Sequence, residues 1–267
     1  MGQNFLVNKK ALRRIGEALE IGAGETILEI GAGTGNLTRE ILKKTRRVMA
    51  IEKDGELVKI LKSQLKNLKP KFKIIEGDVR RVLPRITQRL KNYKIVGNIP
   101  YYLTGRLFRI FQELKNPPTL IVLTIQKEVA KRISAQPPKM NQLAAIVNLW
   151  ARPRILFYLK PRDFWSAPKV SSAVIRLKVL PPAGRNKAAI PEGEPLKKRL
   201  KNEEAIIQLI KNGFQQPRKT LFNNLSRKLA KEKIIKAFAE LKLDDKTRSQ
   251  ELTVDLWIKL AKTLCCF

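Results

Sequence analysis

Histidine is absent from this chain of 267 residues. Its absence excludes Ser-His-Asp and Cys-His nucleophilic sites, histidine-based acid–base catalysis and every metal site with a histidine ligand. Cysteine is scarce, since only Cys265 and Cys266 occur, side by side near the C-terminus. Adjacent cysteines fit no C-x-x-C spacing and rarely bridge comfortably, so we interpret them as incidental thiols in a reducing cytoplasm. We therefore expect a cytoplasmic protein whose chemistry needs neither histidine nor a metal.

Long apolar runs and acidic residues are also scarce. No apolar run reaches transmembrane length, and we find no signal peptide or amphipathic anchor, so we expect no membrane partner. Lys and Arg number 55 against 23 Asp and Glu, which gives a formal net charge of +32. A surplus of this size points to a polyanion, with ribosomal or other nucleic acid as the first candidate and a membrane surface as the second. Lysine on ordinary solvated faces accounts for part of the surplus, but the sign of the inference stands.

The hydrophobic pattern predicts two domains. Strand and helix patterns alternate over residues 1–180, which indicates an α/β sheet, whereas 196–267 has apolar residues at the three- and four-residue spacing typical of helices. The Pro- and Gly-containing stretch 181–195 is predicted to be a linker. We expect a helix at 9–19 and strands at 26–30, 47–51, 72–75, 94–97, 122–125, 155–158 and 173–177. The last two strands have little helix between them, which suggests a hairpin-like sheet edge.

The most informative segment is Asn98-Ile99-Pro100-Tyr101, which closes the predicted strand at 94–97. Ligands of open α/β sheets bind at the carboxyl ends of the strands. Pro100 fixes its own φ and biases Ile99 towards an extended conformation, which gives the Ile99 carbonyl a set direction. That carbonyl and the side-chain oxygen of Asn98 can accept hydrogen bonds from an exocyclic amino group, while Tyr101 offers an aromatic face. The alternative is a proline-containing turn with a satisfied Asn and a half-buried Tyr.

Other predicted strands end in groups that suit a nucleoside. The first is followed by Gly31-Ala32-Gly33-Thr34-Gly35, a glycine turn that opens a helical pattern. Its G-x-G-x-G spacing differs from the G-x-G-x-x-G of dinucleotide binders, so a dehydrogenase is disfavoured. Glu52 ends the second strand and suits bidentate contact with ribose hydroxyls. Asp78 follows the third strand and can accept a hydrogen bond from an adenine amino group.

A second group of candidate residues lies in the segment 163–173, just before the last predicted strand. An enzyme that modifies a base holds the extruded base between apolar or aromatic faces. Phe164 can supply one such face and Tyr101 the other, and Lys169 can meet a flanking phosphate. The alternative is that Phe164 and Trp165 only pack in the core or at a hinge. For Trp165 we prefer that alternative.

This ordered set of strand ends resembles the S-adenosylmethionine (SAM) site of class I methyltransferases. The resemblance implies a Rossmann-like sheet with a small C-terminal all-helical domain, and SAM as the cofactor. It also implies that the two glycines admit the cofactor, that the second strand end takes the ribose and the third the adenine, and that Glu29 fixes the first loop near the methionine end. The residues that it places on the cofactor are Glu29, Gly31, Gly33, Glu52, Asp78, Val79 and Asn98.

Gly2-Gln3-Asn4-Phe5-Leu6, the glycine turn, the Asn98 segment and the Phe164 segment together resemble the rRNA adenine N6-dimethyltransferases. In that family the N-terminal segment folds over the cofactor, so the resemblance implies that Gln3, Asn4 and Leu6 contact SAM. The stretches 216–225 and 248–253 resemble the small-subunit (KsgA-type) branch, and Arg218 and Lys219 are the residues there that we expect to bind RNA.

The resemblance implies dimethylation of N6 of two adjacent adenosines in the 3′-terminal hairpin of small-subunit rRNA, by a monomer acting on a 30S assembly particle. An Erm-type enzyme that methylates large-subunit rRNA and a non-catalytic assembly factor with this fold are the alternatives. Two departures stand out. Ser166 replaces a proline common in the family, which predicts a looser loop, and the chain starts almost at Gly2-Gln3, without the basic extension common in the branch, which predicts weaker RNA affinity.

Overall fold

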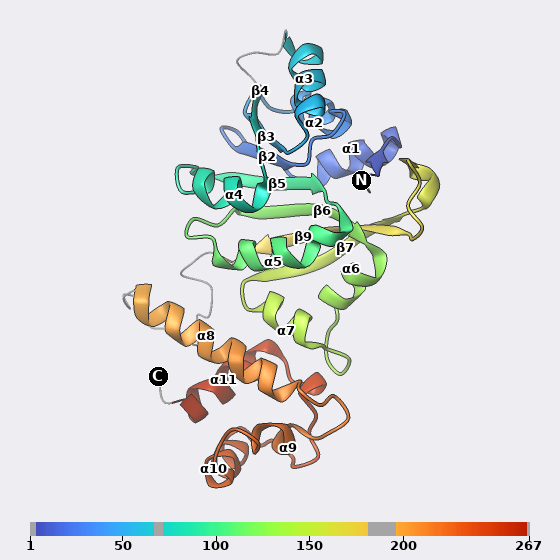
Figure 1. The fold of residues 1–267 in the computed structure, drawn as a ribbon. Helices are drawn as coiled ribbons and strands as arrows, with labels where there is room; N and C mark the ends of the chain where they lie inside the picture. Colours follow the sequence, from blue (N-terminus) through green and yellow to red (C-terminus); the bar gives the residue numbers. More distant parts are fainter. Residues whose placement is uncertain (1–3, 67–71, 181–195, 266–267) are drawn as a thin grey trace. The chain divides into compact units, whose positions relative to one another are not determined.

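The computed structural model describes residues 4–66, 72–180 and 196–265 (Figure 1). Contacts divide the chain into two compact units: Met1–Lys131 with Arg152–Val179, and Arg132–Ala151 with Leu180–Phe267. This corrects one expected boundary, because 132–151 belongs with the C-terminal helices rather than with the sheet. The predicted linker at 181–195 and the predicted cofactor contact Gln3 lie outside the described residues.

The first unit is built on a sheet of seven strands, which confirms the predicted α/β class. Its order is β4-β3-β2-β5-β6-β9-β7, with the first five strands parallel and β9 antiparallel to β6. In chain order the strands are β2 (Thr26–Ile30), β3 (Val48–Glu52), β4 (Phe72–Glu76), β5 (Tyr93–Asn98), β6 (Leu120–Gln126), β7 (Ala151–Leu159) and β9 (Ser172–Val179). All seven predicted strands are present, and the last two lie side by side at one edge as expected.

Helices cover both faces of this sheet (Figure 1). They are α1 (Lys9–Ala18), α2 (Asn36–Leu42) and α3 (Gly55–Gln64) on one face, α4 (Val79–Thr87) and α5 (Thr104–Glu113) on the other, and α6 (Lys127–Ile133) after β6. The amphipathic pattern of α1 explains its docking, because Leu12 and Ile15 are buried against the core that α2 shares. Helices α3 and α4 begin directly beyond β3 and β4, with Asp54 and Asp78 as their N-caps. Their amino ends therefore lie at the carboxyl edge of the sheet.

A second, two-stranded sheet pairs the N-terminus with a loop more than 150 residues later. Strand β1 (Phe5–Leu6) runs antiparallel to β8 (Phe164–Trp165), with Leu6 opposite Phe164 and Phe5 opposite Trp165. We call this pair the N-terminal ribbon. Short 3-10 turns precede β8 (Pro161–Asp163) and follow β5 (Tyr101–Leu103). The sequence predicted neither strand of the ribbon, because two-residue strands have no periodicity to detect.

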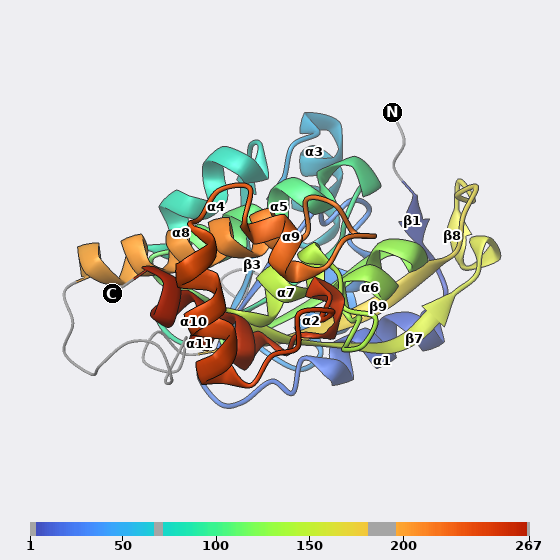
Figure 2. The ribbon, with the colours of Figure 1, turned by 90° about the horizontal axis from the view of Figure 1, so that it is seen from below.

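The second unit is helical, as predicted for its C-terminal part. Its helices are α7 (Gln142–Asn148), α8 (Leu196–Gly213), α9 (Leu221–Leu225), α10 (Lys231–Leu241) and α11 (Val254–Cys265), with a 3-10 turn at Ser249–Glu251. Helix α11 packs on α8 and α10, and α7 and α9 also pack on α8 (Figure 2). The fully buried Trp257 centres this core and lies so close to Gly213 that a side chain there would overlap its ring. Over the described ranges, no helix of either unit is long and apolar enough to cross a membrane.

Candidate active site

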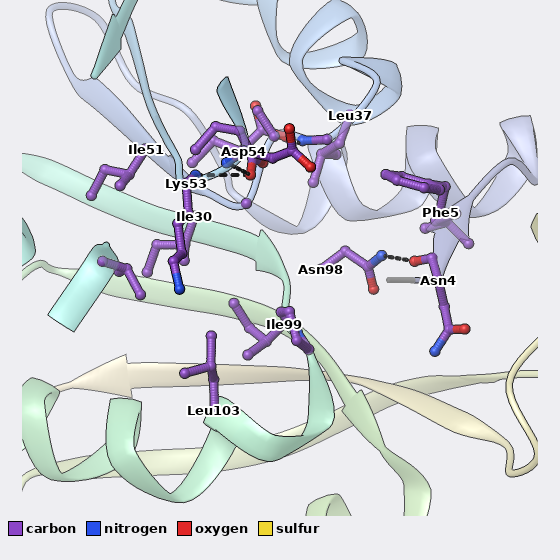
Figure 3. Close-up of a pocket in the computed structure, with 18 of the residues that line it drawn as sticks. Asn4, Phe5, Ile30, Leu37, Ile51, Lys53, Asp54, Asn98, Ile99 and Leu103 are labelled. Carbon is purple, nitrogen blue, oxygen red and sulfur yellow. Dashed lines mark hydrogen bonds between the residues drawn. The ribbon is translucent and has the colours of Figure 1, made fainter. Parts of the chain in front are cut away.

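A cavity of about 610 Å³ opens in the first unit at the carboxyl ends of β2, β3 and β5 (Figure 3). Its volume is in the range of pockets that enclose a cofactor or a drug-sized ligand. Every described residue predicted from the sequence to be catalytic or to contact the cofactor lines it. These residues are Asn4, Leu6, Glu29, Gly31, Gly33, Glu52, Asp78, Val79, Asn98, Ile99, Pro100, Tyr101 and Phe164. Segments from six parts of the chain therefore meet at one place.

The glycine turn forms one wall of the cavity in a backbone conformation that favours glycine. Gly31, Gly33 and Gly35 have φ values of +71°, +55° and +78°. A Cβ at Gly31 would meet only the Asn98 carbonyl oxygen within 4 Å, at 3.8 Å, so the space beside Gly31 is open. A Cβ at Gly33 would lie 2.9 Å from the Phe5 ring. Gly31 thus leaves room for a ligand, whereas Gly33 leaves room for the N-terminal ribbon.

Glu52, predicted to take ribose hydroxyls, also holds the backbone of the site. Its carboxylate is 4% exposed, and Oε2 accepts a hydrogen bond from the Gly33 N–H at 2.9 Å. Oε1 accepts from the N–H groups of Lys53 at 2.8 Å and Asp54 at 3.0 Å. A carboxylate has about four acceptor positions, so one position on Oε2 is left for a ligand. Glu52 therefore links β3 to the glycine turn while it faces the cavity.

Glu29 lies beneath the glycine turn and is 1% exposed. Its Oε2 accepts a hydrogen bond of 2.6 Å from the Thr38 hydroxyl. Burial raises the pKa of Glu29 to about 7; the hydrogen bond from Thr38 opposes this rise, and the nearby negative charge of Glu52 adds to it. Near neutral pH this carboxyl group is therefore close to its titration midpoint. It joins the end of β2 to α2, consistent with its predicted role of fixing the first loop.

Asp78, predicted to accept from an adenine amino group, is engaged by its own helix. It caps α4 by accepting from the Arg80 N–H at 2.9 Å, and the Arg80 guanidinium pairs with it at 2.5 Å. The hydrogen bonds from the Arg80 side chain are the main reason why the pKa of Asp78 is lowered to about 2. Asp78 is therefore ionised at neutral pH, and Arg80 shares its oxygens with any ligand that binds there.

Asn98 and its neighbours are oriented from two sides. The Asn98 amide nitrogen Nδ2 donates a hydrogen bond of 2.6 Å to the backbone carbonyl of Asn4 (Figure 3). Only the nitrogen can donate, so Oδ1 is left as an acceptor. The Ile99 N–H donates to the Thr124 carbonyl at 3.1 Å, which extends the sheet pairing by one residue. Pro100, with φ −54° and ψ 131°, then turns the chain into the 3-10 turn.

Two aromatic residues complete the site. The Tyr101 hydroxyl shares a hydrogen bond of 2.7 Å with the Ser172 hydroxyl at the start of β9, which fixes its ring. Phe164 is 6% exposed and packs in the same apolar cluster as Leu6 and Leu12, yet it lines the cavity. Phe164 therefore packs in the core and also borders the cavity, and its role as a face for a base stays a prediction.

The residues predicted to bind RNA do not line the cavity. Lys169 is exposed in the loop after β8. Arg218 and Lys219 are exposed in the loop before α9 of the second unit. Ser166 has φ +60°, a value that a proline ring cannot adopt. The loop after Phe164 thus follows a path that the family's proline would prevent.

Several residues that line the cavity were not predicted from the sequence. Phe5 lies inside the predicted N-terminal motif, but the contact of its ring with the glycine turn depends on the tertiary fold. Lys53 and Asp54 directly follow Glu52, and Tyr102 and Leu103 directly follow Tyr101, so their proximity to predicted strand ends was the available signal. No group of three or more His, Cys, Asp or Glu residues in the described part of the chain has the geometry to hold a metal ion.

The chain matches one known protein family over nearly its whole length. Residues 1–265 match the family described as ribosomal RNA adenine dimethylase. The chain belongs to this family. It is 34% identical over 266 residues to a ribosomal RNA small subunit methyltransferase A of Clostridium botulinum (strain Kyoto / Type A2), covering 98% of this chain and 91% of that protein. The protein of the same name from Dehalococcoides mccartyi (strain ATCC BAA-2266 / KCTC 15142 / 195) is 31% identical over 268 residues, covering 99% and 86%.

Two solved structures share the fold over nearly the whole chain. A dimethyladenosine transferase from Plasmodium falciparum superposes with a TM-score of 0.79 at 22% identity, covering 96% of this chain and 95% of that one. The 23S rRNA methyltransferase ErmE superposes with a TM-score of 0.76 at 23% identity, covering 98% and 100%. These similarities confirm the predicted methyltransferase fold, with its C-terminal helices, for a member of the ribosomal RNA adenine dimethylase family.

Proposed function

We propose that this protein transfers methyl groups from SAM to N6 of two adjacent adenosines in the 3′-terminal hairpin of small-subunit rRNA, as a cytoplasmic monomer acting on a 30S assembly particle. The observation that carries the proposal is the joint placement of Asn98, the Ile99 carbonyl segment and the rings of Tyr101 and Phe164 on one cavity. Family membership supplies the reaction class, and the two curated relatives bear small-subunit names.

The residues present fit SAM. The open space beside Gly31 admits a ligand close to the backbone, Glu52 retains an acceptor position for a ribose hydroxyl, and Asp78 is an ionised acceptor for an adenine amino group. Val79 and Leu6 add apolar surface, as an adenine ring requires. When bound, SAM supplies a methyl group made electrophilic by its sulfonium.

The protein's own contribution is to position an extruded adenosine. Oδ1 of Asn98 and the Ile99 carbonyl accept the two hydrogens of N6, which draws the nitrogen lone pair out of conjugation with the ring. Tyr101 and Phe164 hold the ring between them. No strong base is needed, because N6 loses its proton to water only after it has gained the methyl group. Such a site works by orientation and fixed dipoles, consistent with a sequence that has no histidine.

The choice of the small subunit rests on the C-terminal stretch 216–225 and on the names of the relatives. We propose that Arg218 and Lys219 of the helical unit, together with Lys169 of the sheet unit, contact rRNA phosphates; all three are exposed. The likeness to ErmE is below 25% identity and concerns the fold. Methylation of the large subunit is therefore the alternative that the following experiment distinguishes.

The test is transfer of radiolabelled methyl from SAM to 30S and 50S particles purified from a strain that lacks this activity. We expect incorporation into 30S particles only, and digestion of the product to yield N6,N6-dimethyladenosine. Label in 50S particles would favour the Erm-type reaction. Absence of label in both, with SAM binding intact by calorimetry, would favour a non-catalytic assembly factor.

A further inference from the structure

Trp165 is exposed to an extent that its neighbours do not explain. Of the three tryptophans, Trp150 and Trp257 are fully buried, whereas Trp165 is 67% exposed. Its ring packs beside that of Phe5, at a centroid distance of 5.7 Å and an interplanar angle of 32°. Of the two packing roles expected for Trp165, in the core or at a hinge, this exposure rules out the core. A large aromatic side chain left in solvent beside a cavity is characteristic of a binding surface.

The backbone that carries Trp165 is held by strand pairing and hydrogen bonds. Trp165 pairs with Phe5 across the N-terminal ribbon. The ribbon is closed by Asp163, whose carboxylate accepts from the Asn8 amide at 2.7 Å and whose carbonyl accepts from the Val7 N–H at 3.0 Å. A backbone held in this way reduces the conformational entropy that is lost when a partner stacks on the Trp165 ring.

The position of Trp165 next to the cavity indicates what kind of partner binds its ring. The preceding residue, Phe164, lines the cavity, and so does Phe5, the residue opposite Trp165 in the ribbon. Successive side chains of a strand point to opposite sides, so Trp165 points away from the side of the ribbon that carries Phe164. A nucleotide joined to an adenosine inside the cavity can therefore reach the exposed ring.

The surrounding charge is that of a nucleic-acid surface. Arg162 and Lys169 flank Trp165 within four residues and are both exposed. Within the described ranges, neither forms an ion pair with a carboxylate. Proteins hold single-stranded nucleic acid with exposed aromatic rings that stack on bases and nearby cations that contact phosphates.

We propose that Trp165 is a stacking platform for the base of a nucleotide adjacent to the target adenosine, with Arg162 and Lys169 on the neighbouring phosphates. This inference rests on the proposed function and extends it, because the protein then holds two unstacked bases rather than one. The second contact favours a strand whose bases have left the helix, so it contributes to selection of a loop over a duplex.

The experiment compares Trp165→Ala and Trp165→Phe with Ile60→Ala, which truncates a 41% exposed apolar side chain of α3 away from the cavity. The KM for unmodified 30S particles, kcat and the Kd for SAM are measured for each. We expect Trp165→Ala to raise the KM for the particle about 10-fold, as loss of one base stack predicts. Trp165→Phe and Ile60→Ala should keep it near the wild-type value, and the Kd for SAM should not change in any variant.

Particles reconstituted with an abasic nucleotide on either side of the target provide the second measurement. The wild type should lose about as much affinity for one of these particles as Trp165→Ala loses for the intact one, and Trp165→Ala should lose no more. An unchanged KM in Trp165→Ala would overturn the inference, and so would an equal rise in its Kd for SAM, which would show that Trp165 only supports the ribbon. Loss of binding to phosphatidylserine vesicles with an unchanged KM would assign the ring to a membrane surface instead. If the wild-type protein methylates no RNA, the proposed function itself is wrong, and the assay of the wild type alone shows this.

Discussion

The side chain of Asn98 is oriented by the backbone of Asn4, whose carbonyl oxygen lies 2.6 Å from Asn98 Nδ2. Asn4 is held in turn because the next residues form the N-terminal ribbon, and because the Asn36 amide donates to the Leu6 carbonyl at 3.1 Å. The first residues of the chain thus determine which atom of a strand-end amide is free to accept. This bond joins a residue proposed to contact the cofactor to one proposed to contact the target base.

Asn98→Asp should lose methyl transfer despite its nearly identical shape. A carboxylate cannot donate to the Asn4 carbonyl, and the two oxygens would repel each other. We expect kcat to fall by on the order of 100-fold or more, as for removal of one preorganised polar group at a reacting centre. Asn98→Ala should lose as much. The measurement is single-turnover transfer of labelled methyl to 30S particles, with calorimetry to show that SAM still binds. Transfer at the wild-type rate by either variant would contradict the role proposed for Asn98.

Glu29 should give the protein a pH-dependent stability. Its pKa is about 7 in the folded state against 4.5 for an unperturbed glutamate, so the folded state binds more protons than the unfolded state between these values. The contribution is fully present below about pH 4.5 and is lost as pH rises through 7. As pH rises, deprotonation of Glu29 lowers the free energy of unfolding by at most about 3 kcal/mol, because each pKa unit corresponds to about 1.4 kcal/mol.

The check is urea unfolding of the wild type and Glu29→Gln at pH 5 and pH 8. Glutamine keeps the shape and an acceptor for the Thr38 hydroxyl but does not titrate. We expect the wild type to lose stability relative to the variant between the two pH values. A difference that stays constant, or that grows in favour of the wild type at pH 8, would rule out a raised pKa for Glu29.

Gly33→Ala should displace the N-terminal ribbon. The new Cβ would lie 2.9 Å from the Phe5 ring at a residue with φ +55°. Gly24→Ala is the matched control, because Gly24 has φ +75° and nothing within 4 Å of a new Cβ. The control should cost about 1–2 kcal/mol from backbone strain alone. Gly33→Ala should cost about 1–3 kcal/mol more, the range for overpacking, and should weaken SAM binding as well. If the two variants lose equal stability in thermal unfolding and bind SAM equally well, the Phe5 ring moves aside without cost.

Asp78→Ala should affect both stability and cofactor binding. It removes the N-cap of α4, which costs about 1 kcal/mol, and an acceptor for adenine, which should raise the Kd for SAM about 10-fold. Arg80→Ala is the informative partner variant, because it frees the Asp78 oxygens and leaves the acceptor in place. Its Kd for SAM should stay equal or fall. Calorimetric titration distinguishes the two variants. Weaker binding of SAM by Arg80→Ala would mean that the guanidinium itself contacts the cofactor.

Local pattern was sufficient to predict the sheet and the convergence of the strand-end groups at its edge. Buried parallel strands read as short apolar runs, and the groups that follow them converge because parallel strands end at one edge. That is why Gly31, Glu52, Asp78 and Asn98 were all predicted from the sequence and all line one cavity. The boundary near residue 132 was not predictable, since the helix pattern there carries no sign of which core it joins.

The sequence by itself determined the order of strand-end groups, the absence of histidine chemistry and the basic charge, because these depend on composition and on short-range periodicity. Only the tertiary structure decided how those groups are used. The contacts Asn4–Asn98, Phe5–Gly33 and Phe5–Trp165 join residues 28 to 160 positions apart, and no local pattern encodes such a pairing. They arise because burying Leu6 and Phe164 in one apolar cluster brings the N-terminus onto the sheet edge, and this burial leaves Trp165 in solvent.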